Sequence, residues 1–196
     1  MNAYQQEQLD ALNQIIDHIE VLGLSQDDAI RSYLLFRQQL DEFTRYHFTA
    51  FCTQACFESR TSACCSKDGI ITFWADMVIN VAHAEKRQID DLRSAIETPL
   101  FPEKCIYLGK KGCRWGIRPL GCALFLCDQV QDGVIGQSPD LGLQWAEFQS
   151  RAKGFRWPDR PVLFDRLEQV FMDAGCRSPL MYINTSPGLL RIKQQP

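Results

Sequence analysis

Cysteine is the residue type in this sequence whose number and grouping point to chemistry. The 196-residue chain has nine cysteines, four of them within residues 52–65 and four within residues 105–127. The eight grouped residues are Cys52, Cys56, Cys64, Cys65, Cys105, Cys113, Cys122 and Cys127. Thiolates are soft ligands that suit zinc and iron–sulfur clusters, and four of them complete either kind of site. The grouping therefore predicts a metal-binding role for these eight residues, in one site or in two.

Two other interpretations of the grouped cysteines stay open. Cysteine is often a small buried core residue, and thiols under redox control can form disulfides. The odd total would leave one cysteine out of a complete disulfide framework. The first residues, MNAYQQEQLDALNQ, lack a basic stretch followed by an apolar one, so we expect a cytoplasmic protein. We interpret the isolated Cys176 as a core residue.

Basic residues surround the second cysteine group. Between residues 104 and 127 there are five basic side chains and no acidic one. They are Lys104, Lys110, Lys111, Arg114 and Arg118. Because nearby cations favour a deprotonated thiol, this charge pattern supports metal binding. Arg118, between Cys113 and Cys122, is a candidate hydrogen-bond donor to a ligating sulfur, whereas Lys110 and Lys111 are more typical of a solvated turn.

The identity of the metal follows less directly. Adjacent Cys64 and Cys65 point in different directions in most backbone conformations, so they suit an extended cluster or two ions better than one tetrahedral zinc. No histidine lies within either cysteine group, which excludes a Cys/His finger pattern. These features favour an iron–sulfur cluster, with zinc as the alternative cofactor.

Few other residues are candidates for chemistry. His47, five residues before Cys52, is a possible ligand or proton donor, and Asp76 either supports the metal site or is a solvated helix residue. The sequence contains no phosphate-binding glycine-rich loop, no G-x-S-x-G elbow and no H-E-x-x-H motif. We therefore leave catalysis open.

The elements that must position the cysteines are mostly helical. Apolar residues at helical spacing predict helices over residues 3–22 and 25–50, which we expect to form an antiparallel hairpin. Ser25-Gln26-Asp27-Asp28 resembles a capping box that opens the second helix. Further helices are predicted at 73–85, 86–97, 141–153 and 162–174. Gly109-Lys110-Lys111-Gly112 predicts the turn of a short β-hairpin. Residues 51–68 show no clean period, so we expect a metal-binding loop there.

The predicted class is mainly α with a small irregular cysteine-rich core and a short β-hairpin, that is, α+β with little strand. We expect one compact domain with three parts. These are an N-terminal helical hairpin (1–50), a cysteine-cluster metal-binding core (51–128) and a C-terminal helical segment packed on the core (129–196). A net charge of −3 gives no reason to expect a nucleic-acid partner, and no apolar run is long enough to cross a membrane. A protein partner remains open.

The cysteine pattern resembles the YkgJ-like cysteine-cluster proteins, which are described as a zinc- or iron-chelating domain. The resemblance lies in the eight ordered cysteines, in Asp68-Gly69-Ile70-Ile71-Thr72, in Cys105-Ile106-Tyr107-Leu108, in Gly112-Cys113 and in Arg118-Pro119, and it covers about residues 50–128. The first cysteines are spaced more widely here than the C-x2-C-x2-C-C usual in that family. The resemblance implies metal binding by all eight cysteines, and a related domain in flagellin lysine methylases implies an iron–sulfur centre.

Three hypotheses follow from these observations. The first is an iron–sulfur protein with a redox or enzyme-accessory role. The second is a zinc-binding structural or interaction module without catalysis, in which the metal replaces part of a weak core. The third is a redox-switched thiol protein. The resemblance supplies a metal but no reaction, because the family has no settled activity.

Overall fold

This computed structural model of the chain describes residues 1–58, 65, 72–156 and 161–185. Helices make up most of these residues and two short strands form one antiparallel hairpin, so the predicted mainly α class with little strand is confirmed. The longer helices are α1 (Ala3–Ile19), α2 (Asp28–Cys52), α3 (Trp74–His83), α4 (Lys86–Glu97), α7 (Pro139–Ala152) and α8 (Leu163–Asp173). The shorter elements are η1 (Leu24–Gln26), η2 (Thr53–Glu58), β1 (Leu108–Gly109), β2 (Gly112–Cys113), α5 (Leu120–Ala123), α6 (Asp128–Gly133), η5 (Ile135–Gln137) and α9 (Tyr182–Thr185). Within the described ranges no helix is both long and apolar enough to cross a membrane.

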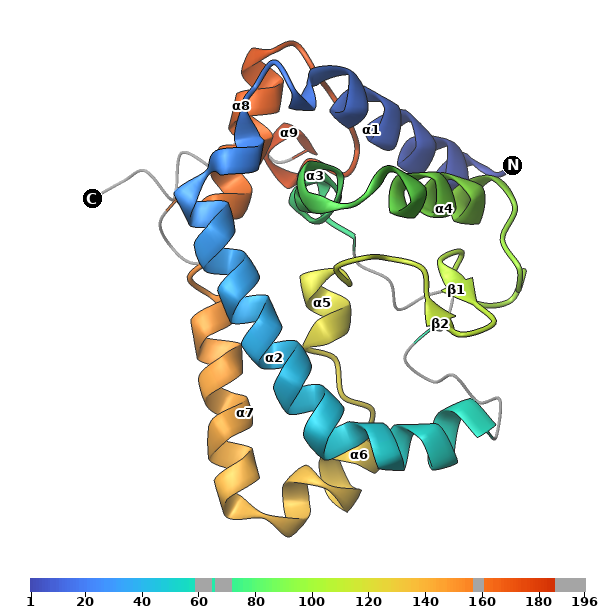
Figure 1. Cartoon of the computed structure of the whole chain (residues 1–196), viewed down its shortest axis with the longest axis vertical. Coiled ribbons are helices and arrows are strands. Elements are labelled where there is room, and N and C mark those ends of the chain that lie inside the picture. The colour runs from blue at the N-terminus through green and yellow to red at the C-terminus, as the bar shows by residue number, and fades with distance from the viewer. Residues whose placement is uncertain (59–64, 66–71, 157–160, 186–196) are drawn as a thin grey trace.

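Helix α3 lies at the centre of the upper half of the molecule (Figure 1). It packs against α1 on one side and α8 on another, and α1 also packs against α4. Every residue from Trp74 to Val81 is buried, which explains why this helix is apolar on nearly all sides. The upper helices therefore form one core, from which α2 and α7 extend downward and beside which the β-hairpin and α5 lie.

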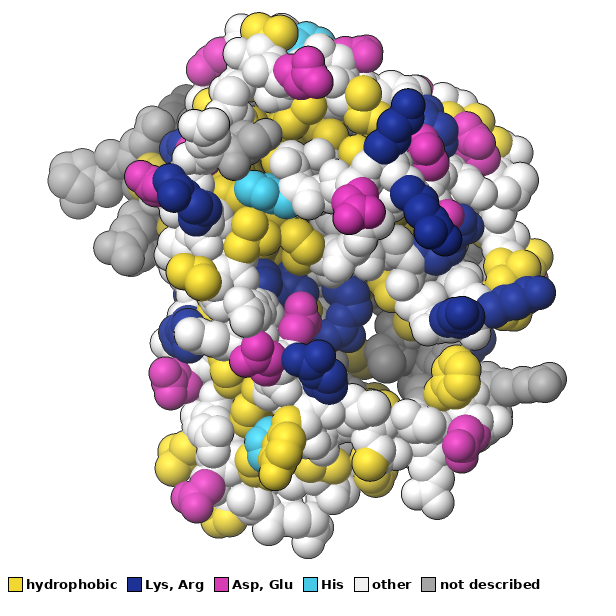
Figure 2. Space-filling model, in the orientation of Figure 1, with side chains coloured by type: hydrophobic (Ala, Val, Ile, Leu, Met, Phe, Trp, Pro, Cys, Tyr) yellow, Lys and Arg dark blue, Asp and Glu magenta, His cyan; other side chains and the backbone are white. Residues whose placement is uncertain are grey.

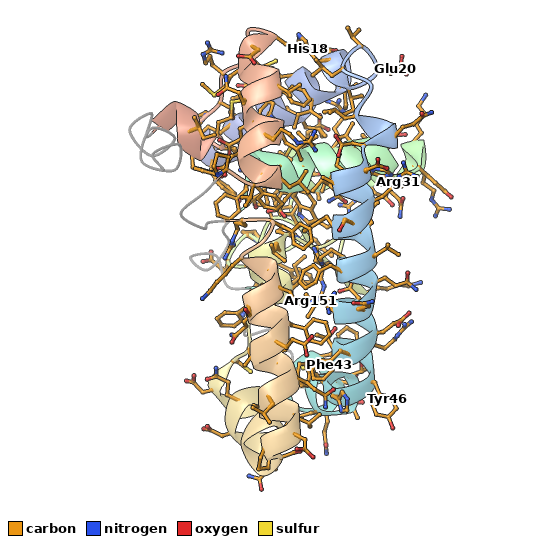
Figure 3. The ribbon with its side chains drawn as sticks, turned by 90° about the vertical axis from the view of Figure 1, so that its left-hand side faces the viewer. His18, Glu20, Arg31, Phe43, Tyr46 and Arg151 are labelled. Atoms are coloured by element: carbon orange, nitrogen blue, oxygen red, sulfur yellow. The ribbon has the colours of Figure 1, made fainter. Side chains whose placement is uncertain are left out.

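The first two helices were expected to pack against each other as an antiparallel hairpin, but their main contacts are with other helices. Helix α1 contacts α3 and α4, whereas α2 runs alongside α7 (Figures 1 and 3). Aromatic rings pack between α2 and α7. The ring centroid of Phe43 lies 5.1 Å from that of Phe148 and 6.2 Å from that of Trp145. Periodicity shows which face of a helix is apolar but not which helix covers it, and here distant segments do so.

The ends of α2 also differ from the prediction. Its N-cap is Asp27, whose side chain accepts hydrogen bonds from the backbone N–H groups of Ala29 (2.9 Å) and Ile30 (3.1 Å), so the proposed cap at Ser25 is wrong. At the other end the helix reaches Cys52 and continues as the π-helical η2. Residues 51–58 are therefore helical and not the expected loop, and most of 59–71 lies outside the described residues. The other predicted helices and the β-hairpin agree with the structure within a few residues.

An ion pair between Asp27 and Arg166 joins the start of α2 to α8, and its contribution to stability can be tested. Arg166 donates to both carboxylate oxygens of Asp27, at 2.6 and 2.7 Å, and these hydrogen bonds lower the pKa of Asp27 from 3.8 to about 2. Because the folded-state pKa lies below the unfolded one, the ion pair stabilises fully above about pH 4 and is lost as the pH falls toward 2. Asp27→Asn retains a capping residue and should cost about 1 kcal/mol at pH 7.

Urea unfolding of both proteins between pH 7 and pH 2.5 measures this effect. The difference in the free energy of unfolding should shrink as the pH falls. Asp28→Asn is the matched control, because Asp28 pairs with Arg31 on the surface and such pairs contribute about 0–1 kcal/mol. A difference that stayed constant down to pH 2.5 would show that the Asp27 charge does not contribute.

Candidate metal centre

A pocket of about 670 Å³ lies between the C-terminal half of α2, the β-hairpin and the segment that carries α5 and α6. Figure 2 shows the hollow from its open side, with basic and acidic side chains on its wall. Six cysteines from both sequence groups line this pocket: Cys52, Cys65, Cys105, Cys113, Cys122 and Cys127. The pocket therefore takes cysteines from both sequence groups, and whether they hold one metal centre or two stays a prediction.

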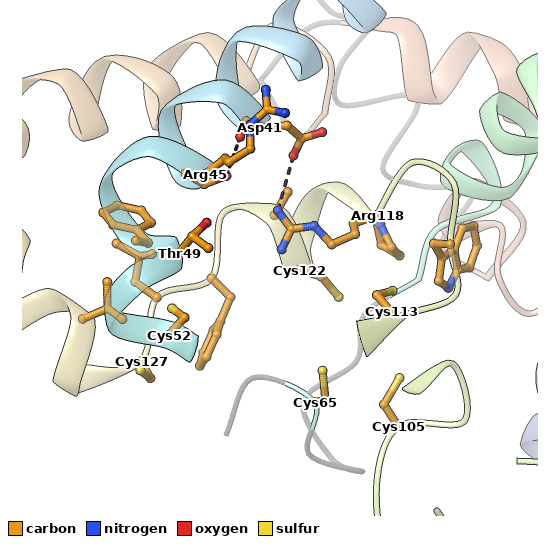
Figure 4. A pocket seen from close by; sticks show the side chains of 18 of the residues that line it. Asp41, Arg45, Thr49, Cys52, Cys65, Cys105, Cys113, Arg118, Cys122 and Cys127 are labelled. Atoms are coloured by element: carbon orange, nitrogen blue, oxygen red, sulfur yellow. Dashed lines mark hydrogen bonds and ion pairs between the residues drawn. The ribbon is translucent and has the colours of Figure 1, made fainter. Parts of the chain in front are cut away.

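Four of these cysteines turn their sulfur atoms toward a common space (Figure 4). Cys113 belongs to β2 and Cys122 to α5, and Cys105 precedes the hairpin. Cys65 is held beside Cys105, whose backbone N–H donates to the Cys65 carbonyl at 2.9 Å. Charge on Cys65 or on Cys113 would raise the pKa of both Cys105 and Cys122, so the four side chains lie within electrostatic reach of one another. We call Cys65, Cys105, Cys113 and Cys122 the four-sulfur group.

The protonation of the thiols in the four-sulfur group is set by burial. Loss of water, with smaller contributions from the other thiols of the group, raises the pKa of Cys105 to about 12 and that of Cys122 to about 11. Desolvation by the pocket walls also raises the pKa of Cys113, although this residue is exposed at the mouth of the pocket. Without a cation these three thiols therefore hold their protons at neutral pH. A bound metal ion would reverse that preference.

The backbone supplies hydrogen-bond donors to two of the sulfurs. The N–H of Tyr107 acts on the sulfur of Cys105 and the N–H of Trp115 on that of Cys113, and each lowers the pKa of its thiol. In both cases the donor lies two residues after the cysteine. The two segments are joined by the hydrogen bond from Arg114 N–H to the Tyr107 carbonyl, at 2.9 Å. The hairpin therefore presents two sulfurs with donors that favour their charged, metal-binding form.

Cys52 and Cys127 lie at the other end of the pocket (Figure 4). Cys52 is the last residue of α2 and Cys127 immediately precedes α6, and these two helices pack together. The side chain of Cys56 and the whole of Cys64 lie outside what the structure describes. Among the described side chains, no three from His, Cys, Asp and Glu lie close enough to hold a metal ion. A ligand role for the eight cysteines stays a prediction.

Arg118 lies on the pocket wall as an ion pair with Asp41. Its Nη2 is 3.3 Å from the Asp41 carboxylate (Figure 4), and its charge lowers the pKa values of Cys113 and Cys122 against the effect of burial. Arg37 lies behind it, almost fully buried, and donates to the Arg118 carbonyl at 2.6 Å. Arg118 therefore contributes positive charge near the four-sulfur group. The predicted hydrogen bond from its side chain to sulfur stays a prediction.

Two buried polar side chains of α3 also hold the segment that leads to Cys122. Asn80 accepts from the Ile117 N–H (2.9 Å) and donates to the Ile117 carbonyl (2.7 Å). Asp76 accepts from the Leu120 N–H at 2.9 Å. Asp76 is 2 % exposed, so its interpretation as a solvated helix residue is wrong and its supporting role is the one the geometry fits. We call Arg37, Asp76 and Asn80, with the four hydrogen bonds they make to residues 117–120, the backbone clamp.

Arg37 and Asn80 were not predicted as site residues, for a physical reason. Both are polar residues within helices, where such side chains are usually solvated. The signal was present in weak form, because Asn80 stands among apolar residues at positions 77–81. A polar side chain in an apolar stretch of helix must find a partner inside the protein.

The remaining candidates lie away from the four-sulfur group. His47 packs against the rings of Phe43 and Tyr46 and is not part of the pocket wall. Cys176 is 4 % exposed and its sulfur lies 3.7 Å from His18 Nδ1, so its interpretation as a core residue is confirmed. His18 Nδ1 also lies 2.8 Å from the Gln14 carbonyl, an acceptor, so this nitrogen carries its proton and cannot act as a base toward the thiol.

Comparison with known proteins adds no family to this description. No protein-family model matches the chain, and neither a curated protein nor a solved structure shows significant similarity to it.

Proposed function

We propose that this protein is a metal protein that holds an iron–sulfur cluster through cysteine thiolates and serves a redox or enzyme-accessory role. The observation that carries the proposal is the four-sulfur group, in which residues from four separate segments of the chain face one space. Four thiolates complete the ligand set of a cluster. The resemblance to the YkgJ-like proteins supports the same ligands.

The surroundings of the four-sulfur group fit a centre of negative charge. Cys105, Cys113 and Cys122 would lose their protons on metal binding, and the centre would carry the charge of the thiolates. Arg118 places positive charge close by, and the N–H groups of Tyr107 and Trp115 donate toward two sulfurs. When bound, an iron–sulfur cluster would supply one-electron redox chemistry. The chain's residues would hold the cluster and favour its thiolate ligands.

Zinc is the alternative, and the observation that favours it is the donor set itself. Four cysteine sulfurs without histidine or carboxylate also make a complete tetrahedral zinc site. In that case the protein is a structural or interaction module. Adjacent Cys64 and Cys65 and the breadth of the sulfur-lined pocket favour the cluster. Because thiols persist in reducing compartments, either form suits a cytoplasmic protein.

Elemental analysis of protein purified without oxygen tests the proposal directly. We expect a brown preparation that contains iron and acid-labile sulfide in defined ratio to the chain. Colourless protein with one or two zinc ions per chain would support the zinc alternative, and chelation should then unfold it. Protein that carries neither metal after reconstitution with ferrous iron and sulfide, or with zinc, would overturn both forms of the proposal.

A further inference from the structure

Helix α1 brings a tyrosine to the far side of the four-sulfur group. Gln8 of α1 accepts a hydrogen bond from the Tyr107 hydroxyl at 2.6 Å, which seats this face of α1 over the segment that begins at Cys105. Tyr4 lies four residues before Gln8 and so on the same face of the helix, one turn closer to the N-terminus. The phenol of Tyr4 interacts electrostatically with Cys105 and Cys122.

The Tyr4 hydroxyl is a buried donor without an acceptor among the described residues. The Thr72 hydroxyl interacts with the Tyr4 phenol and lowers its pKa, but the two groups do not meet in regular hydrogen-bond geometry, and neither has another partner in the described part of the chain. A buried hydroxyl that makes no hydrogen bond costs about 1–3 kcal/mol, so each such group in a native fold calls for an explanation. A tyrosine hydroxyl is protonated at neutral pH and so can donate.

We propose that the Tyr4 hydroxyl donates a hydrogen bond to a ligating sulfur of the metal centre, with Cys105 as its acceptor. This inference rests on the proposed function, because a protonated thiol is a weak acceptor and a metal-bound thiolate is a strong one. The hydrogen bond therefore forms when the metal binds. Through it α1, which precedes the first cysteine by more than thirty residues, stabilises the loaded centre.

The proposal predicts that Tyr4→Phe weakens metal binding but does not destabilise the metal-free protein. In metal-free protein the substitution removes an unsatisfied buried group, so the free energy of unfolding should stay the same or rise. In loaded protein it removes a hydrogen bond of about 1 kcal/mol, so zinc affinity should fall about fivefold. Tyr46→Phe is the matched control, because Tyr46 is 84 % exposed and points away from α7 (Figure 3).

The experiment uses zinc as the probe, in competition with a chromophoric chelator, together with urea unfolding of the metal-free proteins. For the iron–sulfur form, loss of the donor should also lower the reduction potential relative to Tyr46→Phe. If wild type binds zinc and Tyr4→Phe binds it equally well, the inference fails and the proposed function stands. If Tyr4→Phe destabilises the metal-free protein, Tyr4 has an ordinary structural partner and the inference also fails. A wild type that binds neither zinc nor a reconstituted cluster overturns the proposed function itself, and this inference with it.

Discussion

Cys122→Ser should remove the metal centre from the purified protein. A serine hydroxyl is a poor ligand for zinc or iron at this position, so one of the four sulfurs that face each other across the pocket is lost. Even the outer partners of metal ligands are worth about 10–100-fold in affinity, so we expect the metal content per chain to fall by more than about tenfold. Metal analysis with an absorption spectrum measures this, and Cys176→Ser, at a buried cysteine outside the pocket wall, is the control.

The same measurement separates one centre from two. Cys52 and Cys127 lie at the opposite end of the pocket from the four-sulfur group, so the double variant Cys52→Ser with Cys127→Ser should keep its metal. Loss of half the metal in this double variant would show a second centre that involves the first cysteine pair. Full metal content in Cys122→Ser would contradict the assignment of the four-sulfur group.

Sequence periodicity predicted the positions of the longer helices well because most of them bury one face, although α3 is buried nearly all round. Helices α4 and α8 agree with the predicted ranges within a residue or two, since their apolar positions recur at helical spacing. The pattern could not show that α2 packs against α7, because the aromatic rings that join them are more than a hundred residues apart. The start of α2 was misplaced by two residues because Ser25 and Asp27 are both good N-caps.

The cysteines of the candidate site could be picked out from the sequence, whereas the side chains that hold the neighbouring backbone could not. Clustered cysteines indicate metal binding whatever the fold, since the chemistry of thiolates is the same everywhere. That four of them converge depends on tertiary packing, which spacing alone cannot provide. Arg37 and Asn80 were not identified from the sequence because each makes its hydrogen bonds to a residue that is distant in sequence.

The backbone clamp connects the upper core to residues 117–120, the segment that leads to Cys122. Helix α3 is the most completely buried helix of the upper half, and its Asp76 and Asn80 reach out of that core to the backbone of residues 117–120. Arg37 reaches the same backbone from α2. Hydrogen bonds from α2 and α3 therefore hold the backbone just before Cys122, and this links the pocket to the upper core.

Asn80→Ala should be the most destabilising single change in the backbone clamp. It leaves both the N–H and the carbonyl of Ile117 without their partner, and each loses a hydrogen bond inside the protein. We expect the free energy of unfolding to fall by about 2–3 kcal/mol, and zinc affinity to fall at least about tenfold because residues 117–120 are no longer held. Urea unfolding followed by circular dichroism, and zinc titration, measure the two effects.

Asn13→Ala is the matched control for this prediction, because it makes the same change in a helix and so gives the same gain in helix propensity. Asn13 accepts a single hydrogen bond from Arg93 at a half-exposed position of α1, so its loss should cost less than about 1 kcal/mol. Equal stability of Asn80→Ala and Asn13→Ala would mean that Cys122 is positioned by its own short helix and not by the clamp.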